Sequence, residues 1–159
     1  MELTVNGKNL GRKKMPRDGD LSWRATFAPG YVKAVGYKSG KKVLTERIET
    51  TGRATQLHAG TSVEKDVTIV NLTLHDSKGR YVPDACDMLT IEAGEGLKIL
   101  GCGNGDPAFR HKERPLQGEQ QMELTAFNGC LQILVKGHGT LNVGGQGGNI
   151  RQLNLVIEQ

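Results

Sequence analysis

The sequence predicts an all-β protein built from two small β-sandwich modules. Apolar and polar residues alternate along short stretches, which is the period of a half-buried strand. Turn-forming pairs such as Asn-Gly, Pro-Gly and Ser-Gly separate these stretches at intervals of roughly ten residues, a spacing typical of sandwiches. No stretch shows the apolar stripe of an amphipathic helix. We therefore expect strands throughout, joined by glycine-rich turns.

The first module, residues 1–52, holds four or five predicted strands. Leu3 and Val5 alternate with polar neighbours, and the hairpin pair Asn6-Gly7 follows them. The next predicted strands cover residues 21–27, 31–37 and 41–50. About 52 residues is short for a sandwich, and a sheet whose first strand begins at residue 2 would expose an edge. We therefore expect that one more strand of this module lies upstream.

A domain boundary is predicted at residues 51–53. Residues 1–52 carry eleven Lys and Arg against five Asp and Glu, a net charge of +6, whereas residues 53–159 carry ten against twelve, a net charge of −2. The strand pattern restarts at residue 55. We assign residues 1–52 to the small module and residues 53–159 to a second module with the length of an immunoglobulin-like sandwich.

In the second module, the strand predicted around residues 67–75 separates into two faces. Thr68, Val70, Leu72 and Leu74 form the more apolar face, so we place them in the core. The pair Asn128-Gly129 predicts a hairpin between two further strands. The other predicted strands cover residues 88–93, 97–100, 122–127, 131–136 and 153–157, with a turn at residues 76–79.

Composition excludes several classes of protein. No apolar run approaches the roughly 20 residues that a membrane span needs, and the first residues lack the pattern of a signal peptide. The basic run Lys8, Arg12, Lys13 and Lys14 has no interleaved aromatic residue on which bases could stack, so we expect no nucleic-acid partner. Three cysteines, Cys86, Cys102 and Cys130, allow at most one disulfide, and the sequence does not show whether it forms.

Residues able to carry chemistry are present, but they form no convincing catalytic or metal site. The close carboxylate pairs, Glu92 with Glu95 and Asp84 with Asp87, fall in predicted loops. The glycine-rich stretch 101–106 lacks the last glycine of a dinucleotide loop, so it predicts a tight turn. Calcium ligation by Asn104 and Asp106, together with Asp84 or Asp87, is a less favoured alternative. The four histidines lack zinc-site spacing. We expect no catalytic residue, metal or cofactor.

Two series of short motifs resemble glycoside hydrolase family 2 enzymes of the bacterial β-galactosidase type. The stretch ELTVNGKNLG at residues 2–11 resembles the ELFLNGKSLG signature that lies downstream of the catalytic barrel in that family. The further matching stretches are residues 21–24, 27–37 and 50–52 in the first module, and residues 67–76, 79–84, 101–107 and 126–131 in the second. The series covers nearly the whole chain in order.

This resemblance implies that the chain is the non-catalytic C-terminal region of a β-galactosidase-like enzyme, with immunoglobulin-like folds in both modules. It implies the parent's catalytic domain as the partner and a periplasmic or secreted location. The catalytic pair of the family lies in the barrel, so no catalytic residue is carried over. The oligomeric state and the substrate linkage stay open.

Two alternatives remain beside the accessory role. The first is a carbohydrate-binding module, in which exposed aromatic side chains would stack on sugar rings; Tyr81 and Phe109, both in predicted loops, are the candidate glycan contacts. Trp23 alternates with Leu21 and Phe27 on an apolar face, so we expect it in the core. The second is an adhesin-type immunoglobulin-like repeat, which is disfavoured because the two halves are not copies of each other.

Overall fold

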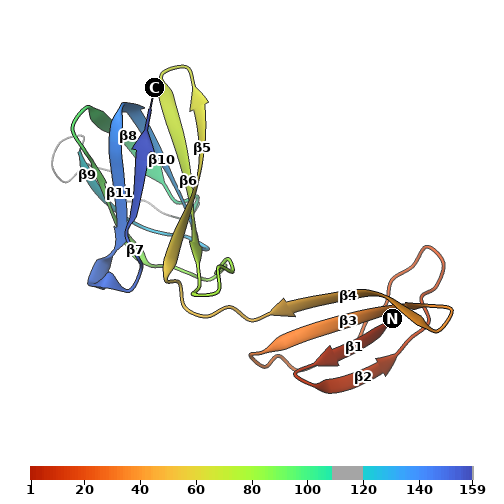
Figure 1. Cartoon of the computed structure of the whole chain (residues 1–159). Coiled ribbons are helices and arrows are strands. Elements are labelled where there is room, and N and C mark those ends of the chain that lie inside the picture. The colour runs from red at the N-terminus through yellow and green to blue at the C-terminus, as the bar shows by residue number, and fades with distance from the viewer. Residues whose placement is uncertain (109–119, 159) are drawn as a thin grey trace. The chain divides into compact units, whose positions relative to one another are not determined.

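The computed structural model describes residues 1–108 and 120–158 and divides into two compact units, Met1–Thr50 and Thr51–Gln159. Its strands form three four-stranded antiparallel sheets, one in the first unit and two in the second (Figure 1). The predicted all-β fold class is confirmed. Among the described residues no helix has the length and apolarity of a membrane span.

The first unit is a single sheet with strand order β2-β1-β3-β4. Its strands are β1 (Glu2–Val5), β2 (Lys8–Arg12), β3 (Tyr31–Lys38) and β4 (Lys41–Glu49). Both hairpin turns form where the sequence predicts them, because Asn6-Gly7 and Ser39-Gly40 adopt the positive φ values that tight hairpin turns need. β1 has neighbours on both sides, so the exposed edges of this sheet are β2 and β4.

The prediction of a strand over residues 21–27 is wrong for this chain. These residues lie in the long connection between β2 and β3 and belong to no strand. Leu21 and Trp23 are half-buried, but Phe27 is 81% exposed. A strand exists only when its main chain finds a neighbour to bond, and within the described residues this segment has none. The first unit is therefore one layer, without the second layer of a sandwich.

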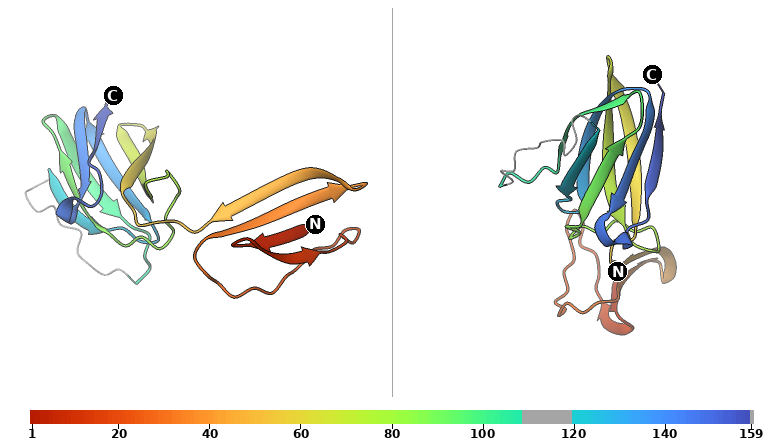
Figure 2. Two further views of the ribbon diagram at one scale, coloured as in Figure 1. Left: turned by 60° about the horizontal axis from the view of Figure 1, so that its bottom comes forward. Right: turned by 90° about the vertical axis from the view of Figure 1, so that its left-hand side faces the viewer.

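The second unit is a two-layer sandwich (Figure 2). One sheet has the order β5-β6-β10-β8 and the other β12-β11-β7-β9. The first sheet contains β5 (Gln56–Glu64), β6 (Val67–His75), β10 (Cys130–Gly137) and β8 (Leu97–Gly103). The second contains β12 (Leu153–Ile157), β11 (Gly139–Gly145), β7 (Met88–Ala93) and β9 (Gln121–Thr125), and a short 3-10 turn, η1 (Gln146–Gly148), follows β11.

The core of the second unit lies between its two sheets. The alternation predicted for β6 is confirmed: Thr68, Val70, Leu72 and Leu74 are all buried. They meet side chains from the facing sheet in one hydrophobic cluster, which includes Leu89, Ile91, Leu141 and Val143. In the first unit, by contrast, Val35 is the only large apolar side chain among residues 1–50 that is buried to this degree. The two units thus differ sharply in how much core each holds.

The turn predicted at Asn128-Gly129 forms, with φ values of 50° and 72°. The strands on its two sides do not pair along their length, however, because β9 pairs with β7 in one sheet and β10 pairs with β6 and β8 in the other. Only the isolated bridge between Phe127 and Cys130 closes the turn. The predicted hairpin is therefore a corner at which the chain changes sheets.

Candidate functional site

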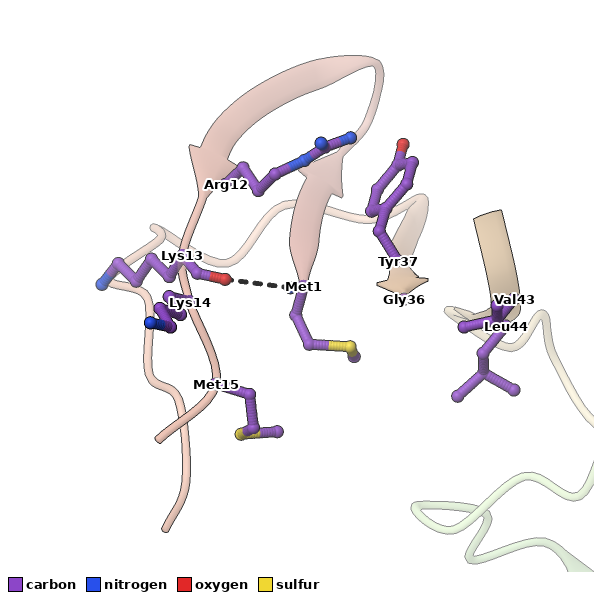
Figure 3. A pocket seen from close by; sticks show the side chains of 9 residues that line it. All are labelled: Met1, Arg12, Lys13, Lys14, Met15, Gly36, Tyr37, Val43 and Leu44. Atoms are coloured by element: carbon purple, nitrogen blue, oxygen red, sulfur yellow. Dashed lines mark hydrogen bonds between the residues drawn. The ribbon is translucent and has the colours of Figure 1, made fainter. Parts of the chain in front are cut away.

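A shallow pocket opens on the sheet of the first unit, at the end where β1 begins (Figure 3). The side chains of Met1, Met15 and Leu44 surround the opening. Two hydrogen bonds of 2.9 Å join Lys13 to Met1: the Lys13 amide donates to the Met1 carbonyl, and the Met1 amino group donates to the Lys13 carbonyl. These bonds hold the segment after β2 beside the start of β1. No sequence pattern predicted this pocket, because the residues that line it come from four separate segments.

Basic side chains form part of the pocket wall. Arg12 lies over the ring of Tyr37, with its guanidinium carbon 3.5 Å from the ring centroid, and its Nε lies 3.5 Å from Glu2. Lys13 and Lys14 line the same pocket. The pocket thus combines apolar side chains with a positively charged wall.

Tyr81, a predicted glycan contact, lies at the surface of the second unit and is 39% exposed. Its hydroxyl donates to the Asn128 carbonyl and lies 3.2 Å from the Cys130 Sγ. The hydrogen bond with Cys130, together with partial burial, raises the pKa of the Tyr81 hydroxyl. These two contacts of the hydroxyl hold the Tyr81 ring in a fixed position at the surface.

A pair of stacked histidines lies beside Tyr81. The rings of His58 and His75 are 3.8 Å apart and nearly parallel, and His75 meets the Tyr81 ring edge-on at 6.0 Å. His75 is fixed at both nitrogens, by Thr73 Oγ1 at 2.9 Å and by the Gly79 carbonyl at 3.0 Å. The sequence did not predict this row of rings, because the register of β5 against β6 is what brings His58 opposite Thr73.

The other predicted residues are less informative. Phe109, the second predicted glycan contact, lies outside the described residues. Asn104 donates to the Thr125 carbonyl and accepts from the Asp106 amide, so its side chain holds the turn that the sequence predicted after β8. Asp84 and Asp87 line a second shallow pocket at one end of the sandwich. Among the described residues, no three His, Cys, Asp or Glu side chains are grouped as metal ligands.

The three cysteines have different surroundings, and no disulfide joins any two of them in the structure. Cys102 is buried, with its Sγ 3.2 Å from the Met122 thioether sulfur, whereas Cys130 is half-buried beside Tyr81. Cys86 is exposed, and its Sγ lies 3.6 Å from the Asp84 carbonyl. The sequence left open whether a disulfide forms, and in this fold the three thiols instead serve as packing groups or weak hydrogen-bond donors.

Comparison with known proteins gives matches in sequence. Residues 1–44 match a family described as a domain of unknown function, DUF4982. Over 114 residues, 67% of this chain, the sequence is 33% identical to Beta-galactosidase BoGH2A of Bacteroides ovatus, and the match covers 13% of that protein. The chain thus spans only a small part of the curated relative that it matches.

Solved structures match over almost the whole chain. A beta-glycosidase from Bacteroides vulgatus has a TM-score of 0.70 at 25% identity, with 99% of this chain and 21% of that chain covered. A glycosyl hydrolase family 2 member from Bacteroides cellulosilyticus has a TM-score of 0.71 at 22% identity, with 99% of this chain and 22% of that chain covered, and it supports the fold alone. The sequence and structural matches agree with the resemblance found in the motifs, and we conclude that this chain is homologous to an all-β segment of glycoside hydrolase family 2 enzymes.

Proposed function

We propose that this chain is a non-catalytic accessory region of a β-galactosidase-like glycoside hydrolase, and that it supports the catalytic domain or the contacts between subunits. The proposal rests on how much of a larger enzyme this chain matches. The chain is matched over 99% of its length by the solved glycosidase from Bacteroides vulgatus, yet it accounts for only 21% of that enzyme. A piece of this size and fold is a module of a larger protein, and its partner is the remainder of the same polypeptide.

The ionisable groups of the chain agree with this role. A glycosidase needs a carboxylic acid with a raised pKa to protonate the leaving group. Among the described carboxylates, the pKa values of Asp66 and Asp76 depart from the ordinary value, and both are lowered. The hydrogen bond from Lys136 is the main cause for Asp66, and the hydrogen bond from Arg80 is the main cause for Asp76. Both carboxylates are therefore ionised at neutral pH, each in an ion pair with a basic side chain.

The proposal is tested by grafting. The segment of Bacteroides ovatus BoGH2A that matches this chain is deleted, and this chain is then fused in its place. We expect the deleted enzyme to lose thermal stability or turnover of an aryl β-galactoside, and the fusion to recover at least part of it. The purified chain alone should show no turnover above a mock purification. Turnover by the chain alone, or a fusion no better than the deletion, would refute the accessory role.

Glycan binding is a second candidate function, favoured by the fixed and partly exposed ring of Tyr81. Aromatic rings held rigidly at a surface can stack on sugar rings with little loss of conformational entropy. Affinity electrophoresis in gels that contain β-glycans tests this. Retardation that is lost in Tyr81→Ala but kept in Tyr31→Ala, which alters a tyrosine of the other unit, would place a glycan site on the second unit. Equal migration of all three proteins in every gel would exclude it.

A further inference from the structure

The sheet β5-β6-β10-β8 (Figure 1) has an outer face, which points away from the core of the second unit. Alternation defines this face, because Val70, Leu72 and Leu74 of β6 are buried and the residues between them point outward. The strand register arranges the outward residues in rows across the sheet. One row, which we call the amide row, consists of Gly60, Asn71, Gln132 and Gly103. The next row along the strands consists of His58, Thr73 and Cys130.

The amide row presents one fixed pair of polar side chains between two positions that have no side chain. Gln132 Nε2 donates a hydrogen bond of 2.8 Å to Asn71 Oδ1, and both side chains are exposed. No hydrogen bond within the described residues engages Asn71 Nδ2 or Gln132 Oε1, so a donor and an acceptor are left for a ligand. A Cβ at Gly60 or Gly103 would meet no atom within 4 Å. A flat ligand therefore reaches the amide pair without hindrance from the neighbouring strands.

Three rings lie at one end of these rows. His75 follows Thr73 by two residues on the same face, and an isolated bridge places Tyr81 beside it. His58 stacks on His75 from the side of β5. Tyr81 is 39% exposed, and His58 is exposed as well. Four residues of β6 separate His75 from Asn71, which is about 13 Å at the rise of a strand. A ligand that contacts both the rings and the amide pair is therefore longer than a single sugar ring.

The charge of the outer face narrows the class of ligand. Among the described strand residues, this face carries no Asp, Glu, Lys or Arg from the row of His75 to the row of Ile69. The charged side chains Glu64, Lys98 and Lys136 lie at the other end of the sheet. A nucleic acid or an acidic peptide would find no cation in these rows. A purely apolar partner would bury the amide pair without hydrogen bonds. An uncharged ligand rich in hydroxyl groups meets both conditions.

We propose that the outer face binds an uncharged, β-linked oligosaccharide of hexopyranose units along β6. One sugar ring stacks on Tyr81, which the two contacts of its hydroxyl hold in place, and the hydroxyl groups of another bond to the pair Asn71 and Gln132. The β linkage rests on the proposed function, in which the parent enzyme acts on β-glycosides. The inference deepens the second candidate function, because it adds the amide pair to Tyr81 and names the class of sugar.

The test uses the whole chain and a panel of uncharged β-linked tetrasaccharides of glucose and of galactose. NMR spectroscopy follows the side-chain amide signals of Asn71 and Gln132 as each sugar is added. We expect at least one sugar to shift both signals in a saturable way and to leave the side-chain signals of Asn154 unchanged. Asn154 is the matched control, because it is an exposed asparagine of β12, in the other sheet.

Variants identify the groups that bind the sugar. Asn71→Ala and Gln132→Ala should each weaken binding about tenfold, since each removes one hydrogen-bond partner of the sugar and releases the other amide. The double variant should weaken binding by less than the product of the two single effects, because the two amides act as a pair. Tyr81→Ala should weaken binding as well, whereas Asn154→Ala should not. Circular dichroism checks that each variant keeps its strands.

Three results would overturn the inference. One is that no sugar of the panel gives a saturable shift. Another is binding that Tyr81→Ala weakens but Asn71→Ala and Gln132→Ala leave unchanged, which would keep the second candidate function and refute this site. The third is a dimer in sedimentation experiments that Asn71→Asp dissociates, which would assign the face to a second copy. The grafting experiment reads the activity of the fused enzyme, not sugar binding by the chain, so the accessory role and this inference fail by different measurements.

Discussion

Arg80 donates two hydrogen bonds to the same carboxylate oxygen of Asp76, Oδ2, from Nη2 at 2.6 Å and from Nε at 2.9 Å. The Gly52 amide donates to that oxygen as well, and the Lys78 and Arg80 amides donate to the other one. Asp76 is almost fully buried. The turn that ends β6 is thereby joined to the segment that begins the second unit. This buried carboxylate satisfies five donors, and no hydrophobic side chain of the same size could do so.

Asp76→Asn should remove much of the acid sensitivity of the second unit. The hydrogen bond from Arg80, followed by that from Gly52, holds the Asp76 pKa far below its usual range. A carboxyl group whose folded-state pKa is depressed contributes its full stabilisation at a pH above its unfolded-state pKa, which is about 4 for aspartate. This stabilisation is lost as the pH falls below about 4 toward the folded-state pKa. Urea unfolding of the wild type and of Asp76→Asn, from neutral pH down to pH 3, measures the effect. The variant should be less stable at neutral pH, and its stability should fall less on acidification.

The matched control is Asp66→Asn. Asp66 pairs with Lys136, but both side chains are more than half exposed, so solvent screens the interaction. We expect little change at neutral pH. If Asp66→Asn altered the acid dependence as much as Asp76→Asn does, the buried network around Asp76 would not be the cause.

Gly129→Ala should destabilise the second unit more than Gly79→Ala does. Both glycines have positive φ, 72° and 73°, where an alanine costs about 1–2 kcal/mol through backbone strain alone. A Cβ at Gly79 would meet no atom within 4 Å, whereas a Cβ at Gly129 would collide with the Val82 carbonyl oxygen. Chemical denaturation of both variants separates strain from collision. Equal losses would show that the chain beside Val82 moves aside freely.

Leu72→Ala should cost the second unit about 2–5 kcal/mol in unfolding free energy, because it opens a cavity between the two sheets. Leu72 is 1% exposed and belongs to the central hydrophobic cluster. Val156→Ala, on the outer face of β12, should change the free energy by less than about 0.5 kcal/mol. Denaturant unfolding measures both. A small loss in Leu72→Ala would contradict the sandwich core described here.

The Tyr81 hydroxyl should ionise at a higher pH than an ordinary tyrosine. The hydrogen bond to Cys130 is the main cause of its raised pKa, and burial adds to it. A group with a raised folded-state pKa stabilises the fold below its unfolded pKa, about 10 for tyrosine, and this stability is lost as the pH rises through the folded-state value. Tyrosinate absorbance against pH follows the ionisation. Cys130→Ala should lower the pKa of Tyr81, whereas Cys86→Ala, which changes an exposed thiol that lies beside the Asp84 carbonyl, should leave it unchanged.

The sequence determined the local features of this protein. The alternation in residues 67–75 assigned Val70, Leu72 and Leu74 to the core, because a strand sends successive side chains to opposite faces. The pairs Asn6-Gly7 and Ser39-Gly40 fixed two hairpins, because few residues tolerate the positive φ of such turns. The sequence did not predict strand β11. Its only apolar residues, Leu141 and Val143, are flanked by glycines, so the alternation of apolar and polar residues is too short to recognise.

Only the tertiary structure decided which segments become neighbours. Asn128-Gly129 specifies a tight turn, but β9 and β10 pair with strands of different sheets, and no local pattern encodes that choice. His58 and His75 come together because of the register of β5 against β6, and an isolated bridge between His75 and Tyr81 adds the third ring. Residues 21–27 have the alternation of a strand, yet in this chain they form none. The period of side chains along a strand is a property of the chain itself, whereas a main-chain hydrogen bond between strands needs a second segment, and only the folded structure shows which segment that is.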